Sequence, residues 1–268
     1  MSGHAKFYIC AIYTLVFFAS ETLADYSGRS LVSSSSADNA ALLVGVSHGL
    51  PGIDIDVDNM EEIATHSAFG FEPRRLEDPL GTSKNVKAEL TRVAQETGPD
   101  GTMLFYYSGH GDVGSLYLED GEQDIQGLRK AIERGRANLG PLERLVMVID
   151  ACFSGSLLDP MRISLLGQIA DPQVRSMLFV DSVFSEMSSR SNYWKTLMVI
   201  ASSQANETSL AGSDGSEFTN AFVRAFQETE LADGNMTMLV NKTKQYTVGH
   251  HPVARFAPSS LQSEPLIR

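Results

Sequence analysis

Short apolar runs alternate with amphipathic segments along most of the chain. The apolar runs are almost unbroken, which is typical of strands buried on both faces of a parallel sheet. The amphipathic segments repeat apolar residues every three or four positions, which predicts helices. We therefore predict an α/β fold, a doubly wound and mostly parallel sheet with helices on both faces. The predicted strands are Ala41–Val46, Thr102–Tyr107, Arg144–Ile149 and Thr196–Ala201, and the predicted helices are Val57–Ala68, Lys84–Gln95 (capped by Thr82 and Ser83), Leu128–Arg134 and Glu217–Gln227.

Two segments break this alternation. Residues Phe153–Lys195 carry glycines, prolines and many serines, and they exceed the length of an ordinary connection. This composition predicts a long loop. From His250 onward, Pro252 and Pro258 predict an irregular C-terminal stretch.

The N-terminus has the pattern of a signal peptide. Lys6 precedes an apolar run, Phe7–Ala19, and the small residue Ala24 follows at a suitable cleavage position. The run is shorter than the roughly 20 residues of a membrane-spanning helix, so we expect a secreted or periplasmic protein, with an uncleaved membrane anchor as the alternative. The predicted organisation is a signal peptide (1–24), a flexible Ser-rich leader (25–39) and one catalytic domain (40–268).

The composition and net charge of the chain limit the kinds of partner that it is expected to bind. The 268 residues are 43% apolar, enough for one sizeable core, and the formal net charge is −12. Few clustered cations are available to bind phosphate, so we expect no nucleic acid partner. An acidic chain suits a cationic ligand or peptide, although a soluble, self-repelling surface explains the same charge.

The chain has two cysteines, and Cys10 lies inside the predicted signal peptide. Cleavage would leave Cys152 as the one thiol, so no internal disulfide could form. A lone cysteine in an exported chain either only fills space in the core or is a reactive group, and composition does not decide between the two.

Two predicted strands end in glycine-flanked polar clusters. One carries His110 and Gly111, and the other carries Cys152. The carboxyl ends of parallel strands form the ligand crevice, so adjacent strands would bring His110 and Cys152 to one edge. An imidazole can take the thiol proton, and the backbone amides of Gly111 and Cys152 are candidate oxyanion donors. Taken singly, Cys152 could be core filler and His110 a turn residue, but the pair at matching strand ends favours catalysis.

These clusters carry a resemblance to a known family. The segments YSGHG (107–111) and DACFSG (150–155) resemble, in this order, the paired signature of metacaspases, orthocaspases and other caspase-like cysteine peptidases of the C14 type. The likeness runs from about Ala40 to Phe226, and ASSQANETS and GSEFTNAF are similar too. It implies a caspase-like fold, a peptide or protein substrate, His110 as base, Cys152 as nucleophile, Gly111 in the oxyanion hole and no required cofactor.

The resemblance also implies a specificity pocket lined by Asp150, Asp56 and Ser108. Two acids would attract a cation, so we predict an endopeptidase that cleaves after Arg or Lys. Structural alternatives are that Asp150 caps a turn and Asp56 caps the helix predicted from Val57. The chain departs from metacaspases at Phe153, where they usually carry His, and it lacks the Gln-Ala that precedes the cysteine of animal caspases.

Calcium activates some metacaspases, but we can place no calcium site. Asp54, Asp56 and Asp58 alternate like the start of an EF-hand loop, yet Asn59 stands where that loop needs glycine and Thr65 where it needs glutamate. An EF-hand is excluded.

Alternative functions remain open at this point. A catalytically silent member would bind peptides or proteins through the same cleft, and another thiol hydrolase, such as an asparaginyl-type peptidase, would differ in pocket preference. If the chain is a peptidase with the predicted specificity, self-processing is expected at a basic residue of the long loop. The candidates are Arg162, Arg175, Arg190 and Lys195.

Overall fold

The computed structural model describes residues 39–66, 70–112, 114–153, 172–189, 192–202, 214–231, 235–247 and 252–259. The predicted signal peptide and almost all of the leader lie outside these residues. The strands are β1 (Asn39–Val46), β2 (Phe71–Glu77), β3 (Thr102–Asp112), β4 (Ser115–Leu118), β5 (Gly121–Asp124), β6 (Leu142–Phe153), β7 (Trp194–Ser202) and β8 (Val253–Ala257). The helices are α1 (Ile53–Thr65), α2 (Ser83–Glu96), α3 (Ile125–Arg136), α5 (Pro172–Ser188), α6 (Glu217–Leu231) and α7 (Met236–Tyr246).

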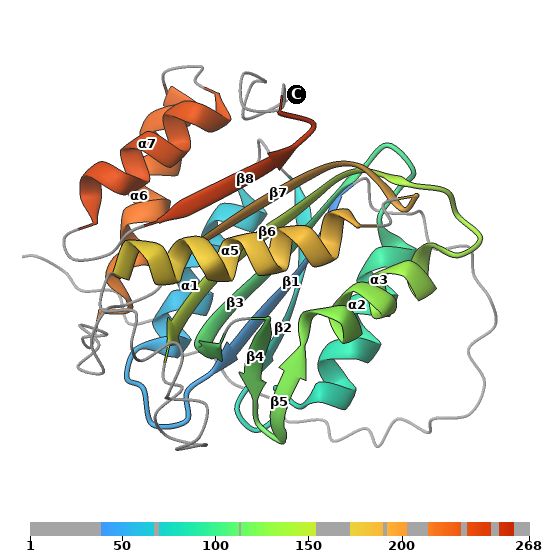
Figure 1. Ribbon diagram of the computed structural model, residues 1–268, viewed down its shortest axis with the longest axis horizontal. Coiled ribbons are helices and arrows are strands. Elements are labelled where there is room, and N and C mark those ends of the chain that lie inside the picture. Colours follow the sequence, from blue (N-terminus) through green and yellow to red (C-terminus); the bar gives the residue numbers. More distant parts are fainter. Residues whose placement is uncertain are drawn as a thin grey trace, which may run out of the picture. The chain divides into compact units, whose positions relative to one another are not determined.

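These strands form one mostly parallel sheet in the order β2-β1-β3-β6-β7-β8 (Figure 1). The pairs from β2 through β7 are parallel, β8 is antiparallel to β7, and β4 and β5 form a hairpin that pairs with the end of β3. The predicted doubly wound α/β fold is confirmed.

Helices cover both faces of the sheet because both faces of the central strands are apolar. Leu42 and Val44 of β1 join one core with α2, α3 and α5, whereas Ala41 and Leu43 join the other with α1, α6 and α7. Side chains alternate along a strand, so an unbroken apolar run supplies a buried face to each layer. The predicted strands therefore occupy the centre of the sheet.

Two sequence predictions were wrong. The segment expected to be one long loop contains α5, whose Phe179, Val180, Val183 and Met187 are fully buried at helical spacing. Pro172 begins this helix, a position where its missing N–H and fixed φ favour helix formation. The C-terminal stretch expected to be irregular contains β8, a five-residue edge strand flanked by Pro252 and Pro258.

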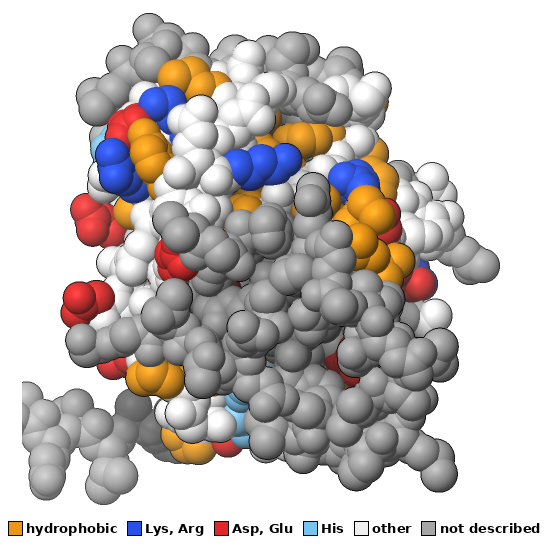
Figure 2. Space-filling model, turned by 60° about the vertical axis from the view of Figure 1, so that its left-hand side comes forward, with side chains coloured by type: hydrophobic (Ala, Val, Ile, Leu, Met, Phe, Trp, Pro, Cys, Tyr) orange, Lys and Arg blue, Asp and Glu red, His pale blue; other side chains and the backbone are white. Residues whose placement is uncertain are grey.

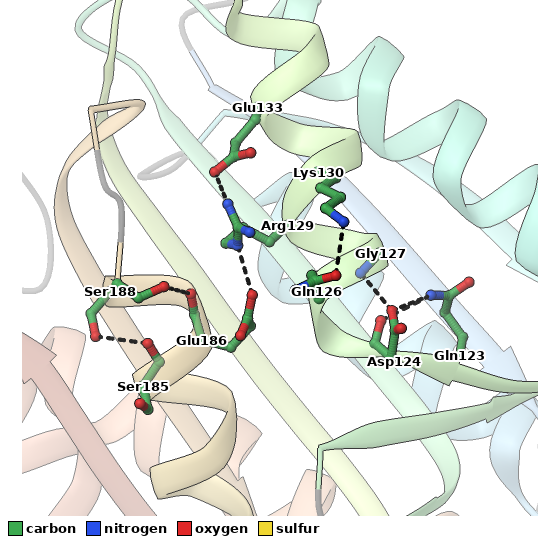
Figure 3. A network of polar contacts seen from close by, with 11 residues as sticks. Gln123, Asp124, Gln126, Gly127, Arg129, Lys130, Glu133, Ser185, Glu186 and Ser188 are labelled. Carbon is green, nitrogen blue, oxygen red and sulfur yellow. Dashed lines mark hydrogen bonds and ion pairs between the residues drawn. The ribbon is translucent and has the colours of Figure 1, made fainter.

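A charged side chain links α5 to α3. Arg129 of α3 donates to Glu186 of α5 at 2.9 Å and to Glu133 one turn further along its own helix (Figure 3). Asp124 begins α3 by accepting from the backbone N–H of Gly127 at 2.6 Å. The arginine is nearly buried, at 8% side-chain exposure, so this pair is worth more than an exposed ion pair.

A second arginine, Arg136 at the end of α3, is buried beneath the C-terminus of α2. Its guanidinium donates to four backbone carbonyls: Ala94 at 2.9 Å, Thr97 at 2.7 Å, Gly140 at 2.8 Å and Leu139 at 3.2 Å. Helix C-termini leave carbonyls without intrahelical partners, and Arg136 supplies donors to them. Burial lowers the pKa of this guanidinium, but it stays far above neutral pH.

Charged and apolar side chains lie together on one described face of the molecule (Figure 2). Where side chains are described, the face in Figure 2 carries acidic, basic and apolar groups interspersed. Within the described part of the chain, no helix is long and apolar enough to cross a membrane.

Candidate active site

The two predicted catalytic residues occupy adjacent strands. His110 near the end of β3 is the register partner of Cys152 near the end of β6, within an uninterrupted parallel ladder from Thr102 to Gly111. Neighbouring strands lie about 4.8 Å apart, so the two backbones meet at the carboxyl edge of the sheet. The predicted adjacency of His110 and Cys152 is confirmed. The structure describes Cys152 by its backbone.

His110 is 7% exposed, and its buried Nδ1 has no hydrogen-bond partner among the described residues. Burial lowers the pKa of His110, and the neighbouring His48 lowers it further. The imidazole therefore favours its neutral form near pH 7, the form in which a histidine accepts a proton.

Gly109 sets the backbone that precedes His110. It has φ +155°, and a Cβ at this position would lie 2.6 Å from the carbonyl oxygen of Val46 in β1. Real Cβ atoms do not approach a backbone oxygen so closely, so only glycine fits. The Tyr107 hydroxyl lies 2.7 Å from the His110 carbonyl oxygen and 2.7 Å from that of Tyr117, which holds the strand end against the β4–β5 hairpin.

Gly111, the predicted oxyanion-hole residue, lies between β4 and β6. Its register partners are Leu116 and Phe153. A Cβ here would lie 2.9 Å from the Cβ of Ala151, so glycine allows the two strand ends to pack closely.

The predicted pocket residues come together on the side of the sheet that α1 and α6 cover. Ser108 donates its hydroxyl to Asp56 at 2.8 Å, and the backbone N–H of Ser216 donates to the same carboxylate at 2.6 Å. Asp150 accepts from the hydroxyls of Ser216 and Thr219, the latter at 2.8 Å. Ser108 and Asp150 are register partners on β3 and β6. All five residues are buried.

Two buried carboxyl groups in one site repel each other. Burial raises the pKa of Asp56 to about 7, and the charge of Asp150 adds to this effect. Beneath them, the Tyr106 hydroxyl contacts Thr219 Oγ1 at 2.6 Å, and burial raises its pKa well above the ordinary value for tyrosine. Asp56 therefore titrates near neutral pH, which is characteristic of functional sites more often than of surface acids.

The structural alternative for Asp56 was wrong. The helix begins at Ile53 rather than near Val57, so Asp56 lies in its first turn, with Gly52 at the N-cap position. Asp150 lies within β6, and its carboxylate accepts from the hydroxyls of Ser216 and Thr219.

Sequence reasoning missed Ser216 and Thr219. Ser216 caps α6 by accepting from the Thr219 N–H at 3.0 Å, and it also contacts both acids. A serine directly before a helical run with apolar spacing is an N-cap signal that the sequence contains. The contacts of Ser216 with Asp150, 66 positions earlier, and with Asp56, 160 positions earlier, have no signal in the local sequence.

A metal site and the processing sites remain unassigned. Among the described residues, no group of three or more His, Cys, Asp or Glu side chains could hold a metal ion. Arg175 lies within α5, and Lys195 lies in β7, where it contacts Glu143 at 2.6 Å. Arg162 and Arg190 lie outside the described residues.

Comparison with known proteins decides the family. The caspase domain that defines peptidase C14 matches residues 38–250, most of the chain. The chain belongs to the caspase domain family. This is a family of cysteine peptidases. Metacaspase-1A of Aspergillus oryzae is 28% identical to this caspase domain over 166 residues, which cover 50% of the chain and 39% of that relative. The chain thus spans about two fifths of the length of the relative.

Solved structures share the fold of this caspase domain. Protein GSU0716 from Geobacter sulfurreducens has a TM-score of 0.61 at 17% identity, covering 85% of this chain and 98% of that one. Caspase-1 from Spodoptera frugiperda has a TM-score of 0.51 at 14% identity, covering 83% and 86%. At such identities the likeness concerns the fold alone.

Proposed function

We propose that this caspase domain is a cysteine endopeptidase that cleaves after Arg or Lys, with Cys152 as nucleophile and His110 as general base. One observation carries the proposal: His110 and Cys152 are register partners at the carboxyl edge of the sheet. Asp150 lies two positions before Cys152 on β6, and Asp56 accepts from Ser108, which lies two positions before His110 on β3. Both acids are buried, and they support the preference for a cation.

The acylation step starts with proton transfer. Neutral His110 takes the Cys152 thiol proton, and the thiolate attacks the carbonyl carbon of the scissile bond. The resulting oxyanion accepts from the backbone N–H groups of Gly111 and Cys152. His110 then gives its proton to the leaving amine, the C–N bond breaks, and a thioester remains on Cys152.

The deacylation step uses water. His110 removes a proton from a water molecule that attacks the thioester carbonyl, and the same oxyanion donors act again. The C–S bond breaks, the sulfur regains the proton from His110, and the carboxylic acid product leaves. Neither step requires a cofactor.

The acidic pair supports the choice of substrate. A guanidinium or ammonium group entering the pocket would replace hydroxyl donors to Asp56 and Asp150 with a charged donor, and charge-assisted hydrogen bonds are the stronger kind. An acidic side chain would instead meet two carboxyl groups. We therefore expect discrimination against Asp by repulsion as well as attraction of Arg or Lys.

The test is turnover of matched fluorogenic peptides that end in Arg, Lys, Asp or Asn, with and without calcium. The chain from residue 25 is compared with its Cys152→Ala and His110→Ala variants. Cleavage after Arg or Lys that both variants abolish would support the proposal. Preference for Asp or Asn would refute the acidic pocket, and turnover by Cys152→Ala would refute the nucleophile. Binding of these peptides without turnover would favour a catalytically silent binding protein.

Processing and export are two further parts of the proposal. Self-cleavage at Arg162 or Arg190 is favoured over Arg175 and Lys195, because the latter two lie in a helix and in a strand, which must unfold locally to enter a cleft. A Cys152→Ala protein with the same processed bands would refute self-cleavage.

If the chain is exported and its signal peptide is removed, protein recovered outside the cytoplasm should begin near Asp25, as N-terminal sequencing would show.

A further inference from the structure

A second histidine, His48, lies beside His110 in the turn that follows β1. The two ring centroids are 6.3 Å apart with an interplanar angle of 29°, which is within the range of stacked aromatic pairs. Neither the family signature nor the proposed reaction steps use His48.

The turn holds His48 in one place through three contacts. The Leu50 N–H donates to the Ser47 carbonyl at 2.8 Å, and the Ser47 N–H donates to the carboxylate of Asp78 at 3.2 Å. The His48 Nε2 lies 3.1 Å from the carbonyl oxygen of Leu118. A carbonyl can only accept, so Nε2 carries the proton and the ring orientation is set.

The backbone of His48 is strained for a residue with a side chain. Its φ is +41°, in the left-handed region that glycine, asparagine and aspartate tolerate best. Gly49, next in the turn, also has a positive φ, +90°. Such strain persists where surrounding contacts hold it, and it concentrates at functional sites.

His110 itself lacks an orienting hydrogen bond at Nδ1, which is buried and has no partner among the described residues. We infer that His48 is a positioning residue for His110: its ring, fixed by Leu118 and the Ser47 turn, packs against the His110 imidazole and keeps it aligned with the end of β6. This inference rests on the proposed function, because alignment matters only if His110 exchanges protons with Cys152.

The charges around this pair add a second effect. Asp78, after β2, and Glu119, in the β4–β5 turn, interact electrostatically with His48. His48 in turn lowers the pKa of His110, after the larger effect of burial. Cys152 on β6 and Asp112 further along β3 are the other titratable neighbours by register and sequence. Removing the His48 side chain should therefore raise the pKa of His110.

Two variants separate the ring from its nitrogen atoms. His48→Asn suits the left-handed backbone and removes the ring, whereas His48→Phe keeps a ring and removes the ring nitrogens and the contact with Leu118. His66→Asn is the matched control, because His66 ends α1 at the opposite edge of the sheet. Each protein is assayed for kcat and KM with an Arg peptide from pH 5 to 9. Selective ¹⁵N-histidine NMR, assigned with His110→Ala, gives the pKa of His110.

For His48→Asn we expect kcat to fall about tenfold or more at unchanged KM, since small misalignments of a catalytic group have effects of this size. His48→Phe should recover part of kcat, since it restores a ring without the contact to Leu118. In both variants the acid limb of kcat/KM should move to higher pH, because neutral His110 is lost as pH falls through a raised pKa. His66→Asn should match the wild type.

Three kinetic results would overturn the inference: wild-type kcat in His48→Asn, an increase in KM alone, or His48→Phe as impaired as His48→Asn. If the wild type cleaves no peptide, the proposed function fails separately. The NMR titration then still tests the contact between the two rings, and an unchanged chemical shift and pKa of His110 in both variants would overturn it.

Discussion

The proposed acidic pocket makes a quantitative prediction about pH. Burial and the charge of Asp150 raise the pKa of Asp56 to about 7, so this carboxyl group is protonated below pH 7 and ionised above it. The ionised fraction rises from about one tenth at pH 6 to about nine tenths at pH 8. Attraction for a cationic side chain should therefore strengthen about ninefold over these two pH units.

The assay compares two peptides that differ only in charge. Citrulline has the shape of arginine without its charge, so the ratio of kcat/KM for the Arg peptide to that for the citrulline peptide cancels the titration of His110. In the wild type this ratio should rise about ninefold from pH 6 to pH 8, with its midpoint near pH 7.

Replacing the carboxyl group should remove this dependence. In Asp56→Asn the ratio should become independent of pH and fall at pH 8 by about tenfold or more, the size expected for a lost charge-assisted hydrogen bond in a buried site. Asp58→Asn is the control, because the Asp58 side chain is 58% exposed and pairs with Arg75. A flat ratio in the wild type, or an unchanged ratio in Asp56→Asn, would refute the reasoning.

Two further predictions concern the scaffold of the site. Arg136→Met should lower the free energy of unfolding, measured by urea denaturation, by about 3–5 kcal/mol, because carbonyls at the ends of two helices lose their donors. The control Arg92→Met changes an exposed side chain and should cost under about 0.5 kcal/mol. A loss below about 1 kcal/mol in Arg136→Met would contradict the proposed role of Arg136. Gly109→Ala should lower kcat about a hundredfold, because the added Cβ would clash with the Val46 carbonyl oxygen and shift the neighbouring His110. Gly140→Ala, at φ +74° with open space around it, should cost about 1 kcal/mol of stability and leave kcat unchanged.

The centre of the fold was predictable because its signal is local. The apolar runs of β1, β3, β6 and β7 must be buried on both faces, and each is followed by a segment with helical spacing. The edges of the sheet were not predicted. β2 buries only Phe71 and Leu76 among charged residues, and β8 is short and flanked by prolines, so neither has the apolar pattern of a central strand.

The helix α5 was missed for a different reason. Pro172 and the surrounding serines were interpreted as loop residues, although the apolar positions Phe179, Val183 and Met187 follow helical spacing. Propensity is a weak guide where packing decides, and burial of this stripe against the sheet stabilises the helix. The link between Arg129 and Glu186 adds to that docking.

By itself the sequence determined which residues end the central strands, and therefore that His110 and Cys152 would lie at one edge of a parallel sheet. Parallel strands bring their carboxyl ends to one edge, whatever the loops do, but only the structure made β3 and β6 neighbours. Only the tertiary structure decided the surroundings of these residues. Ser216 reaches Asp56 from a segment 160 residues away, and His48 meets His110 across a turn. Contacts of this kind depend on how the layers pack, and packing leaves no periodic pattern in the chain.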